Sequence, residues 1–511
     1  MSLTQMCARE RGWSTVAEPV ERPSTEPPGT PDGGLKARLG VRGGANNWQF
    51  TAVFAVAGLA LAAGVVLAAG PWDSGQRKAE RDRAAAAERT GGAHHDAGDP
   101  EGPAPAPSAP AVLAALSGTG TVTQDAPAGA VRDLSAVLEP LMANDALGDR
   151  RAAVVIDTAT GKRLYGKGAD APMTPASTVK IATTVAALSA LGPAHRIPTS
   201  VRVSDDLRTV TLVGGGDPTL DKAALRALAT GTARALKEGK AASVRLRYDA
   251  SGYSGPSHHP IGPNENIAPM SALMVNEGRQ DDSSKGPAPR TEDPAEDAAR
   301  TFAGLLDHAG VTLKGAPAPG RPAKKSRTVA THLSAPLSGL VERALTNSDN
   351  DIAEALARQT AVAAGEPADF NGGRRAVTAQ LKKLRLPLKA VNIADGSGLD
   401  RHDKVTAALL AGLLARAADP AHPELRSVLT GLPVAGFSGT LSGRYTTKAG
   451  GTGFIRAKTG TLTGVNSLAG TVVDTRGRLL AFAFLASGTT APTEAQAALD
   501  RLATALGAGK R

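Results

Sequence analysis

The hydrophobic pattern divides the chain into an N-terminal part with little periodicity and a longer C-terminal part in which helical and strand patterns alternate. Residues 1–47 and 72–128 are rich in proline, glycine, alanine and charged side chains, a composition that supplies too little apolar surface for a core. We expect a disordered tail at 1–47 and an extended Ala/Pro-rich tether at 72–128.

One apolar run interrupts this part of the chain. Phe50–Ala69 is 20 residues long with Thr51 as its only clearly polar member, which is enough to cross a bilayer as a helix. A cleaved signal peptide is the competing interpretation, but the 49 residues ahead of the run are too long for an ordinary n-region. The pattern therefore predicts a single N-terminal transmembrane anchor at 48–71.

From residue 129 onward the pattern predicts an antiparallel sheet with flanking helices. Apolar residues follow Pro175 on most faces as far as Leu191, which predicts a buried helix. Strands are expected at Ala152–Ile156, Arg163–Tyr165, Phe454–Ala457, Val465–Val473 and Leu479–Ala486. The first two strands form a hairpin, and the last three lie together near the C-terminus.

A second set of elements lies between these parts. Val201–Val213 alternates as strands, Leu220–Lys237 has a helical period, and Ser243–Tyr248 reads as a strand. We therefore predict one small inserted α/β subdomain at 199–280, between main-domain segments at 129–198 and 281–507. The fold class is α/β.

Composition excludes some functions. The net charge is +10, but the basic residues are scattered among acids and only 3% of residues are aromatic, so we expect no nucleic-acid partner. The single cysteine, Cys7, allows no intramolecular disulfide. The pairs His94-His95 and His258-His259 lack further ligands at metal spacing, so we interpret them as exposed loop residues and predict no metal and no cofactor.

Three short motifs point to chemistry: Ser177-Thr178-Val179-Lys180, Ser348-Asp349-Asn350 and Lys458-Thr459-Gly460. Each alone is weak, but together and in this order they are the signature of a serine acyl-transfer site. A spacing of three in a helix puts Lys180 beside Ser177, and a buried lysine near another cation loses proton affinity and can act as a base. The second motif falls in a turn between two helical patterns, and the third lies on a strand near a sheet edge.

With these motifs the sequence resembles the penicillin-binding protein and serine β-lactamase superfamily, and more closely its low-molecular-mass penicillin-binding protein 4 type, a D-alanyl-D-alanine carboxypeptidase and endopeptidase. Three further passages look like that family's connecting segments: Leu212–Leu220, Ala268–Leu273 and Asp395–Leu399. The resemblance covers about 131–507 and implies a β-lactamase/transpeptidase-like fold with a helical lobe. The family's second inserted domain is missing here, since 279–294 is only a short polar stretch.

The resemblance implies catalytic roles for the matching residues. Ser177 would be the nucleophile and Lys180 the base that takes its proton. The backbone N–H groups of Ser177 and Thr461 would form the oxyanion hole. Ser348 would relay a proton to the departing amine, and Asn350 would hold the peptide amide and orient Lys180.

The third motif would bind substrate. The resemblance implies that Lys458, Thr459 and Thr461 bind the terminal carboxylate, that Lys458 also lowers the proton affinity of Lys180, and that Gly460 lets the strand approach closely. The implied substrate is the D-Ala-D-Ala end of a peptidoglycan stem peptide, with β-lactams as acylating inhibitors. Such a substrate would place the catalytic domain outside the cell membrane, with the tail inside.

Two alternatives stay open at this stage. A serine β-lactamase would need a dedicated deacylating base; class A enzymes have a glutamate about 34 residues after the Asn of the middle motif, where this chain has Leu384 between Lys383 and Arg385. A catalytically idle wall-binding scaffold is the other alternative, but such a protein would be free to lose the motif residues that this chain keeps.

Overall fold

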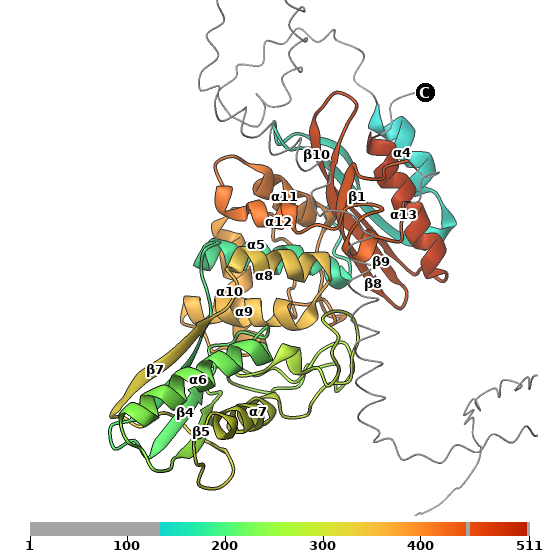
Figure 1. Ribbon diagram of the computed structural model, residues 1–511. Coiled ribbons are helices and arrows are strands. Elements are labelled where there is room, and N and C mark those ends of the chain that lie inside the picture. Colours follow the sequence, from blue (N-terminus) through green and yellow to red (C-terminus); the bar gives the residue numbers. More distant parts are fainter. Residues whose placement is uncertain (1–132, 446–449, 508–511) are drawn as a thin grey trace, which may run out of the picture. The chain divides into compact units, whose positions relative to one another are not determined.

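Two five-stranded sheets organise the chain in the computed structural model, which describes residues 133–445 and 450–507 (Figure 1). The first sheet has the order β2-β1-β10-β9-β8, and every neighbouring pair is antiparallel. Its strands are β1 (Arg150–Asp157), β2 (Arg163–Lys167), β8 (Ile455–Leu462), β9 (Val465–Val473) and β10 (Leu479–Ser487). The predicted hairpin and C-terminal strands are thus confirmed, and β8 lies at an edge of the sheet, as predicted.

The central strands β9 and β10 are buried along nearly their whole length, because helices cover both faces of the sheet. On one face, α4 (Leu134–Met142) and α13 (Pro492–Gly507) pack over Phe482 and Phe484. On the other face lies α11 (Ala407–Ala418), which shares a core with Ala481 and Ala483 of β10. This burial of apolar area on both faces is the main stabilisation of the lobe.

A helical layer joins that second face. It contains α5 (Lys180–Leu191), α8 (Leu337–Thr346), α9 (Asn350–Ala364), α10 (Phe370–Lys383) and α12 (Arg426–Thr430). Helix α9 starts where the Asp349 side chain accepts a hydrogen bond from the N–H of Ile352, and it ends at Gly365, which has the left-handed conformation at φ 70°. All eleven residues from Asp351 to Ala361 are buried, so this helix has no solvent face along most of its length.

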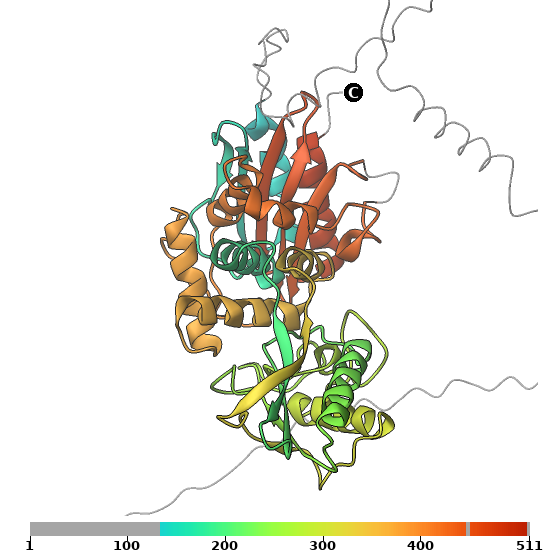
Figure 2. The ribbon, with the colours of Figure 1, turned by 60° about the vertical axis from the view of Figure 1, so that its left-hand side comes forward.

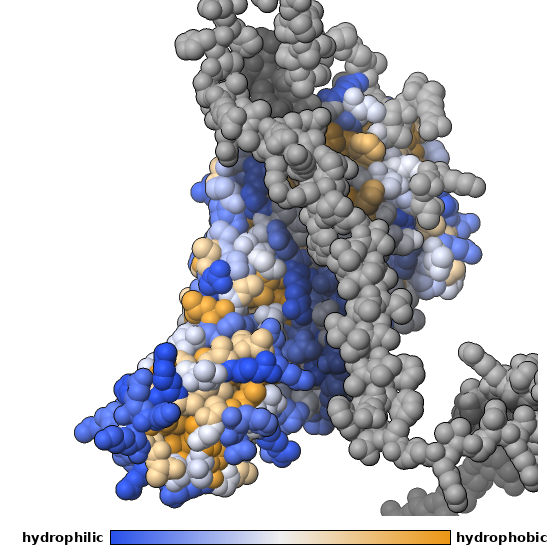
Figure 3. Space-filling model, viewed as in Figure 1, coloured by the Kyte–Doolittle hydropathy of each residue, from blue (hydrophilic) through white to orange (hydrophobic). Residues whose placement is uncertain are grey.

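The second sheet forms an inserted lobe with the order β6-β5-β4-β3-β7. Its strands are β3 (Pro198–Ser204), β4 (Thr209–Val213), β5 (Arg245–Asp249), β6 (Ala318–Pro319) and β7 (Ser326–Leu333), and its helices are α6 (Lys222–Glu238) and α7 (Pro294–His308). On the face drawn in Figure 3, hydrophobic residues of this lobe are interspersed with hydrophilic ones.

The inserted lobe extends past the predicted limit at 280. Strand β7 pairs antiparallel with β3, so the chain enters and leaves the lobe on neighbouring strands (Figure 2). The hydrophobic pattern missed this because β7 is an edge strand with mostly exposed or half-buried side chains, and β6 has only two residues.

Short 3-10 turns complete the described chain: Asp145–Leu147, Ala176–Val179, Asn276–Gly278, Pro423–Leu425 and Gly439–Leu441. Within 133–445 and 450–507, no helix combines the length and hydropathy that crossing a bilayer requires. The predicted tail (1–47), anchor (48–71) and tether (72–128) all precede these residues, so those predictions lie outside what the structure describes.

Candidate active site

Ser177 lies in the 3-10 turn Ala176–Val179, and α5 begins three residues later at Lys180. The prediction of an α-helical first turn is therefore corrected to a tighter one. The preceding residue, Ala176, has φ 48°, an uncommon conformation for a residue with a side chain. Gly398 packs against it so closely that a Cβ there would lie 2.1 Å from the Ala176 carbonyl oxygen. Close packing thus holds the turn that presents Ser177.

Lys180 is fully buried, and its Nζ lies within hydrogen-bond distance of three oxygens. It is 3.0 Å from Ser177 Oγ, 2.7 Å from Asn350 Oδ1 and 2.6 Å from the carbonyl oxygen of Ser397. The side chain is thereby fixed with its amine beside the Ser177 hydroxyl. This is the geometry that a base for Ser177 requires.

The second motif lies in the turn between α8 and α9, as predicted. Ser348 has φ 59° in this turn, and Asn350 is the first residue of α9. The Asn350 amide nitrogen donates to the carbonyl oxygen of Asn266 at 2.9 Å, while its oxygen accepts from Lys180. Asn350 therefore links Lys180 to the inserted lobe.

The third motif lies on the edge strand β8. Lys458 is fully buried and donates to Ser348 Oγ at 2.9 Å, while Thr459 is half-buried and Thr461 is exposed. Gly460 is required sterically, because a Cβ there would lie 2.2 Å from Ser467 Oγ and 2.6 Å from the carbonyl oxygen of Pro175. The missing side chain lets β8 approach the turn that carries Ser177.

The two buried lysines have reduced proton affinity. Burial lowers the pKa of Lys180 to about 8, against the opposing attraction of nearby carboxylates such as Asp395 and Glu354. Burial and the positive charge of Lys180 lower the pKa of Lys458 well below its usual value. Since repulsion between two like charges is mutual, protonated Lys458 also disfavours the charged form of Lys180.

Sequence reasoning missed the residues behind Lys180. The Asp395–Leu399 segment was recognised as a connecting passage but was given no role, although its Ser397 carbonyl contacts Lys180. His259, predicted to be exposed, is only 2% exposed, because its Nε2 pairs with Asp395 Oδ2 at 2.8 Å. Its neighbour His258 remains partly exposed, and His94-His95 lies outside the described residues.

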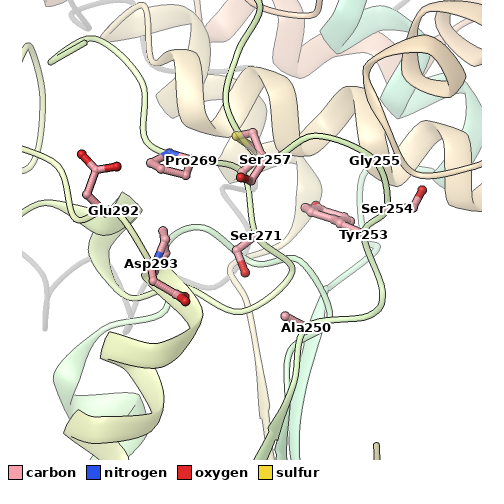
Figure 4. A pocket seen from close by; sticks show the side chains of 11 residues that line it. Ala250, Tyr253, Ser254, Gly255, Ser257, Pro269, Ser271, Glu292 and Asp293 are labelled. Carbon is pink, nitrogen blue, oxygen red and sulfur yellow. The ribbon is translucent and has the colours of Figure 1, made fainter. Parts of the chain in front are cut away.

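A separate pocket of about 270 Å³ lies in the inserted lobe (Figure 4). Tyr253, Ser271 and Glu292 are among its lining residues, none of which comes from the three motifs. The candidate active site is therefore the junction of the 3-10 turn, the α8–α9 turn and β8, where the motif side chains meet.

Comparison with known proteins agrees with this geometry. The family model of the D-Ala-D-Ala carboxypeptidase 3 (S13) family matches residues 134–289 and 280–506. The chain belongs to this family. It is 36% identical over 424 residues to carboxypeptidase Rv3627c of Mycobacterium tuberculosis, covering 79% of this chain and 89% of the relative. It is 37% identical over 434 residues to carboxypeptidase DacB of Mycolicibacterium smegmatis, covering 81% and 91%.

The fold has a solved counterpart. The crystal structure of penicillin binding protein 4 from Haemophilus influenzae aligns with a TM-score of 0.61 at 22% identity, covering 73% of this chain and 98% of that one. This likeness supports the mixed α/β, β-lactamase-like fold that the sequence predicted. The family and the two mycobacterial relatives identify the chain as a serine peptidase, a hydrolase of the D-Ala-D-Ala carboxypeptidase type.

Proposed function

We propose that the chain releases the terminal D-alanine from peptidoglycan stem peptides through an acyl-enzyme on Ser177. The observation that carries this proposal is that the three motifs meet: Lys180 reaches Ser177 and Asn350, and Lys458 reaches Ser348, two residues before Asn350 in the same turn. It supplies a nucleophile, a base beside it and a second buried cation within one site.

In the first step, neutral Lys180 takes the Ser177 proton as Oγ attacks the carbonyl carbon of the penultimate D-alanine. The backbone N–H groups of Ser177 and Thr461 stabilise the oxyanion. Ser348, hydrogen-bonded to Lys458, relays the proton that Lys180 took from Ser177 to the departing amine, which leaves Lys180 neutral again. Water then attacks the ester, Lys180 takes the proton of that water and returns it to Ser177 Oγ, and the shortened peptide is released.

The edge position of β8 suits an extended substrate. A peptide can pair with the free edge of a sheet through its own backbone, and Thr459 and Thr461 lie where its terminal carboxylate would bind, next to the Lys458 charge. The same site would cleave a D-alanyl cross-link to diaminopimelate, with a different leaving amine. A β-lactam ring would acylate Ser177 in the same way.

The site of action follows from the substrate. Peptidoglycan stem peptides lie outside the cytoplasmic membrane, so we propose that residues 48–71 anchor the chain in one pass with the catalytic part outside. Protease treatment of intact cells tests this topology: the catalytic part should be degraded from outside, and protection of it would contradict the proposal.

Intact-mass spectrometry of the full chain in detergent, after incubation with benzylpenicillin, tests the acyl-enzyme. A stable adduct that forms with Ser177 and is absent from Ser177→Ala supports the proposal, as does D-alanine release from a synthetic stem pentapeptide. Rapid hydrolysis of the drug would favour a β-lactamase. An intact drug without any adduct would favour an idle scaffold.

A further inference from the structure

Behind Lys180, the loop 395–398 is held by two buried carboxylates from different elements. Glu354 Oε1 on α9 accepts hydrogen bonds from the backbone N–H groups of Gly396 and Ser397, at 2.8 and 2.9 Å. The loop's own Asp395 accepts from Ser397 N at 3.1 Å and from Gly398 N at 2.5 Å. These bonds fix the peptide whose carbonyl oxygen lies 2.6 Å from Lys180 Nζ.

The inserted lobe braces this loop from the other side. His259 Nε2 donates to Asp395 Oδ2 at 2.8 Å, while its Nδ1 accepts from the N–H of Ile261 at 3.3 Å. Its ring packs edge-on against Phe370 of α10, with the ring centroids 5.3 Å apart. Both nitrogens of this buried histidine are therefore used, and Asp395 is held between the inserted lobe and the loop.

Helix α9 positions Lys180 through two of its residues. Asn350 contacts the amine directly, and Glu354, one turn later on the helix, contacts the loop that supplies the amine's third acceptor. Glu354 is 1% exposed. Burial and the charge of Asp395 raise the pKa of Glu354 to about 7, against the opposing positive charge of Arg358, so Glu354 is ionised over the alkaline part of the pH range. Asp395, Asp349, Glu354 and Asp403 all act on Lys180 through their charge, opposite in sign to Lys458.

We propose that Glu354 is a positioning residue for the base of the reaction: it aims the Ser397 carbonyl at Lys180 and sets the proton affinity of that lysine through its charge. The inference rests on the proposed function, since it assigns Glu354 a task toward Lys180. A nearby carboxylate stabilises the protonated amine, so Glu354 limits how far burial lowers the pKa of Lys180. The residue touches no reacting atom.

The experiment is the rate of acylation of the full chain by a fluorescent penicillin between pH 6 and 10. Glu354→Gln keeps an oxygen that can accept both N–H bonds but removes the charge. In this variant, the fall of the acylation rate on the acid side of the pH profile, its acid limb, should move to lower pH by roughly half a unit to one unit. The reason is that Lys180 stays neutral to a lower pH once the charge of Glu354 is gone. Glu354→Ala loses the acceptor as well, so its plateau rate should fall at least about tenfold.

Asp351→Asn is the matched control, because Asp351 is a second buried acid on α9 that faces Arg290 and the N–H of Ala268. Its acid limb should stay at the wild-type position, with the folded fraction of each variant counted from the acylation end point. An unmoved limb in Glu354→Gln, or an equal shift in Asp351→Asn, would overturn the inference. Failure of wild-type acylation would instead reject the proposed function.

The His259, Glu354 and Asp395 side chains also lie close enough together to hold a metal ion. Elemental analysis of the purified chain decides between the two arrangements. Stoichiometric zinc, with acylation that a chelator abolishes, would overturn the hydrogen-bonded arrangement because the metal would occupy the atoms that hold the loop. Metal-free protein whose acylation rate a chelator does not change would support the hydrogen-bonded arrangement.

Discussion

Two buried groups of acidic side chains lie along α9, and they differ in how their charge is balanced. The first, behind Lys180, consists of Glu354, Asp395 and Asp403, and its neighbouring bases include His259 and Lys180 itself. The second, beneath the α8–α9 turn, consists of Glu277, Asp349 and Asp351. Its partners are Arg279, Arg290 and Arg343.

The two groups therefore have different roles: the first acts on the catalytic base, and the second supports the fold. Arginine stays charged at any ordinary pH and fixes carboxylates in a planar, directional contact, so the second group holds the α8–α9 turn through cations whose charge does not change, although burial raises the pKa of its Glu277 to about 8. Histidine and a lysine of lowered pKa change their charge within a few pH units of neutrality. Asp349 of the second group also acts on Lys180 through its charge, but Glu354 and Asp395 of the first group are the acids that also hold the loop whose carbonyl contacts the amine.

The largest effect should come from Lys180 itself. Lys180→Met removes the base while filling its space, so acylation by penicillin should slow by about 10³-fold. The melting temperature should hold or rise, because a buried charge has been removed. Stopped-flow acylation and thermal unfolding measure the two quantities. A folded variant that loses less than tenfold in rate would show that Lys180 is not the base.

Breaking the second group should cost stability and leave chemistry in place. Arg290 is nearly buried and lies 3.0 Å from Asp351 Oδ2. Arg290→Met leaves that carboxylate buried without its cation, which should lower the free energy of unfolding by about 3 kcal/mol. Urea unfolding measures this loss. The acylation rate of the folded fraction should stay within about threefold, and adding Asp351→Asn should restore part of the stability.

A smaller effect should appear in the pH dependence of stability. Lys180 has a pKa of about 8 in the folded chain, below the unfolded value of roughly 10.4. Between these values the unfolded state binds more protons, so stability should increase as the pH rises through this window. Urea midpoints at pH 8 and 10 should therefore differ more in the wild type than in Lys180→Met. Equal differences would contradict the lowered pKa.

The smallest effect is expected from a charge pair outside both groups. Arg375 and Glu366 form an ion pair at 2.7 Å on the surface, with side chains 47% and 36% exposed. Exposed pairs of this kind contribute little, so Arg375→Gln should leave the urea midpoint and the acylation rate unchanged. A measurable loss would mean that ion pairing as such, rather than burial, explains the result for Arg290.

Much of this arrangement was predictable from local patterns. The strands β1, β2, β9 and β10 have strong alternation or continuous apolar runs, and the turn carrying Ser348 lies between two clear helical periods. The motif spacing also predicted that Lys180 lies beside Ser177, and the structure brings Lys458 to Ser348. The catalytic roles assigned to these residues stay predictions.

The rest depended on contacts between distant segments. His259 and Asp395 are 136 residues apart, and the hydrophobic pattern of neither segment predicts their contact. Asp395–Leu399 contacts Lys180 through a backbone carbonyl, which every residue has. No residue type in the sequence therefore indicates this contact. The extent of the inserted lobe was missed for the same reason, since β7 is recognised only through its pairing with β3.

The burial of α9 on all sides restricts how this enzyme can change over generations. Eleven consecutive residues are buried, and nearly any substitution among them opens a cavity, crowds a neighbour or leaves a charge unpaired. Substitutions in this helix should therefore be rare among variants with altered β-lactam sensitivity. Substitutions should instead accumulate in the surface loops of the inserted lobe, where altered side chains can change access to Ser177 without unfolding the chain.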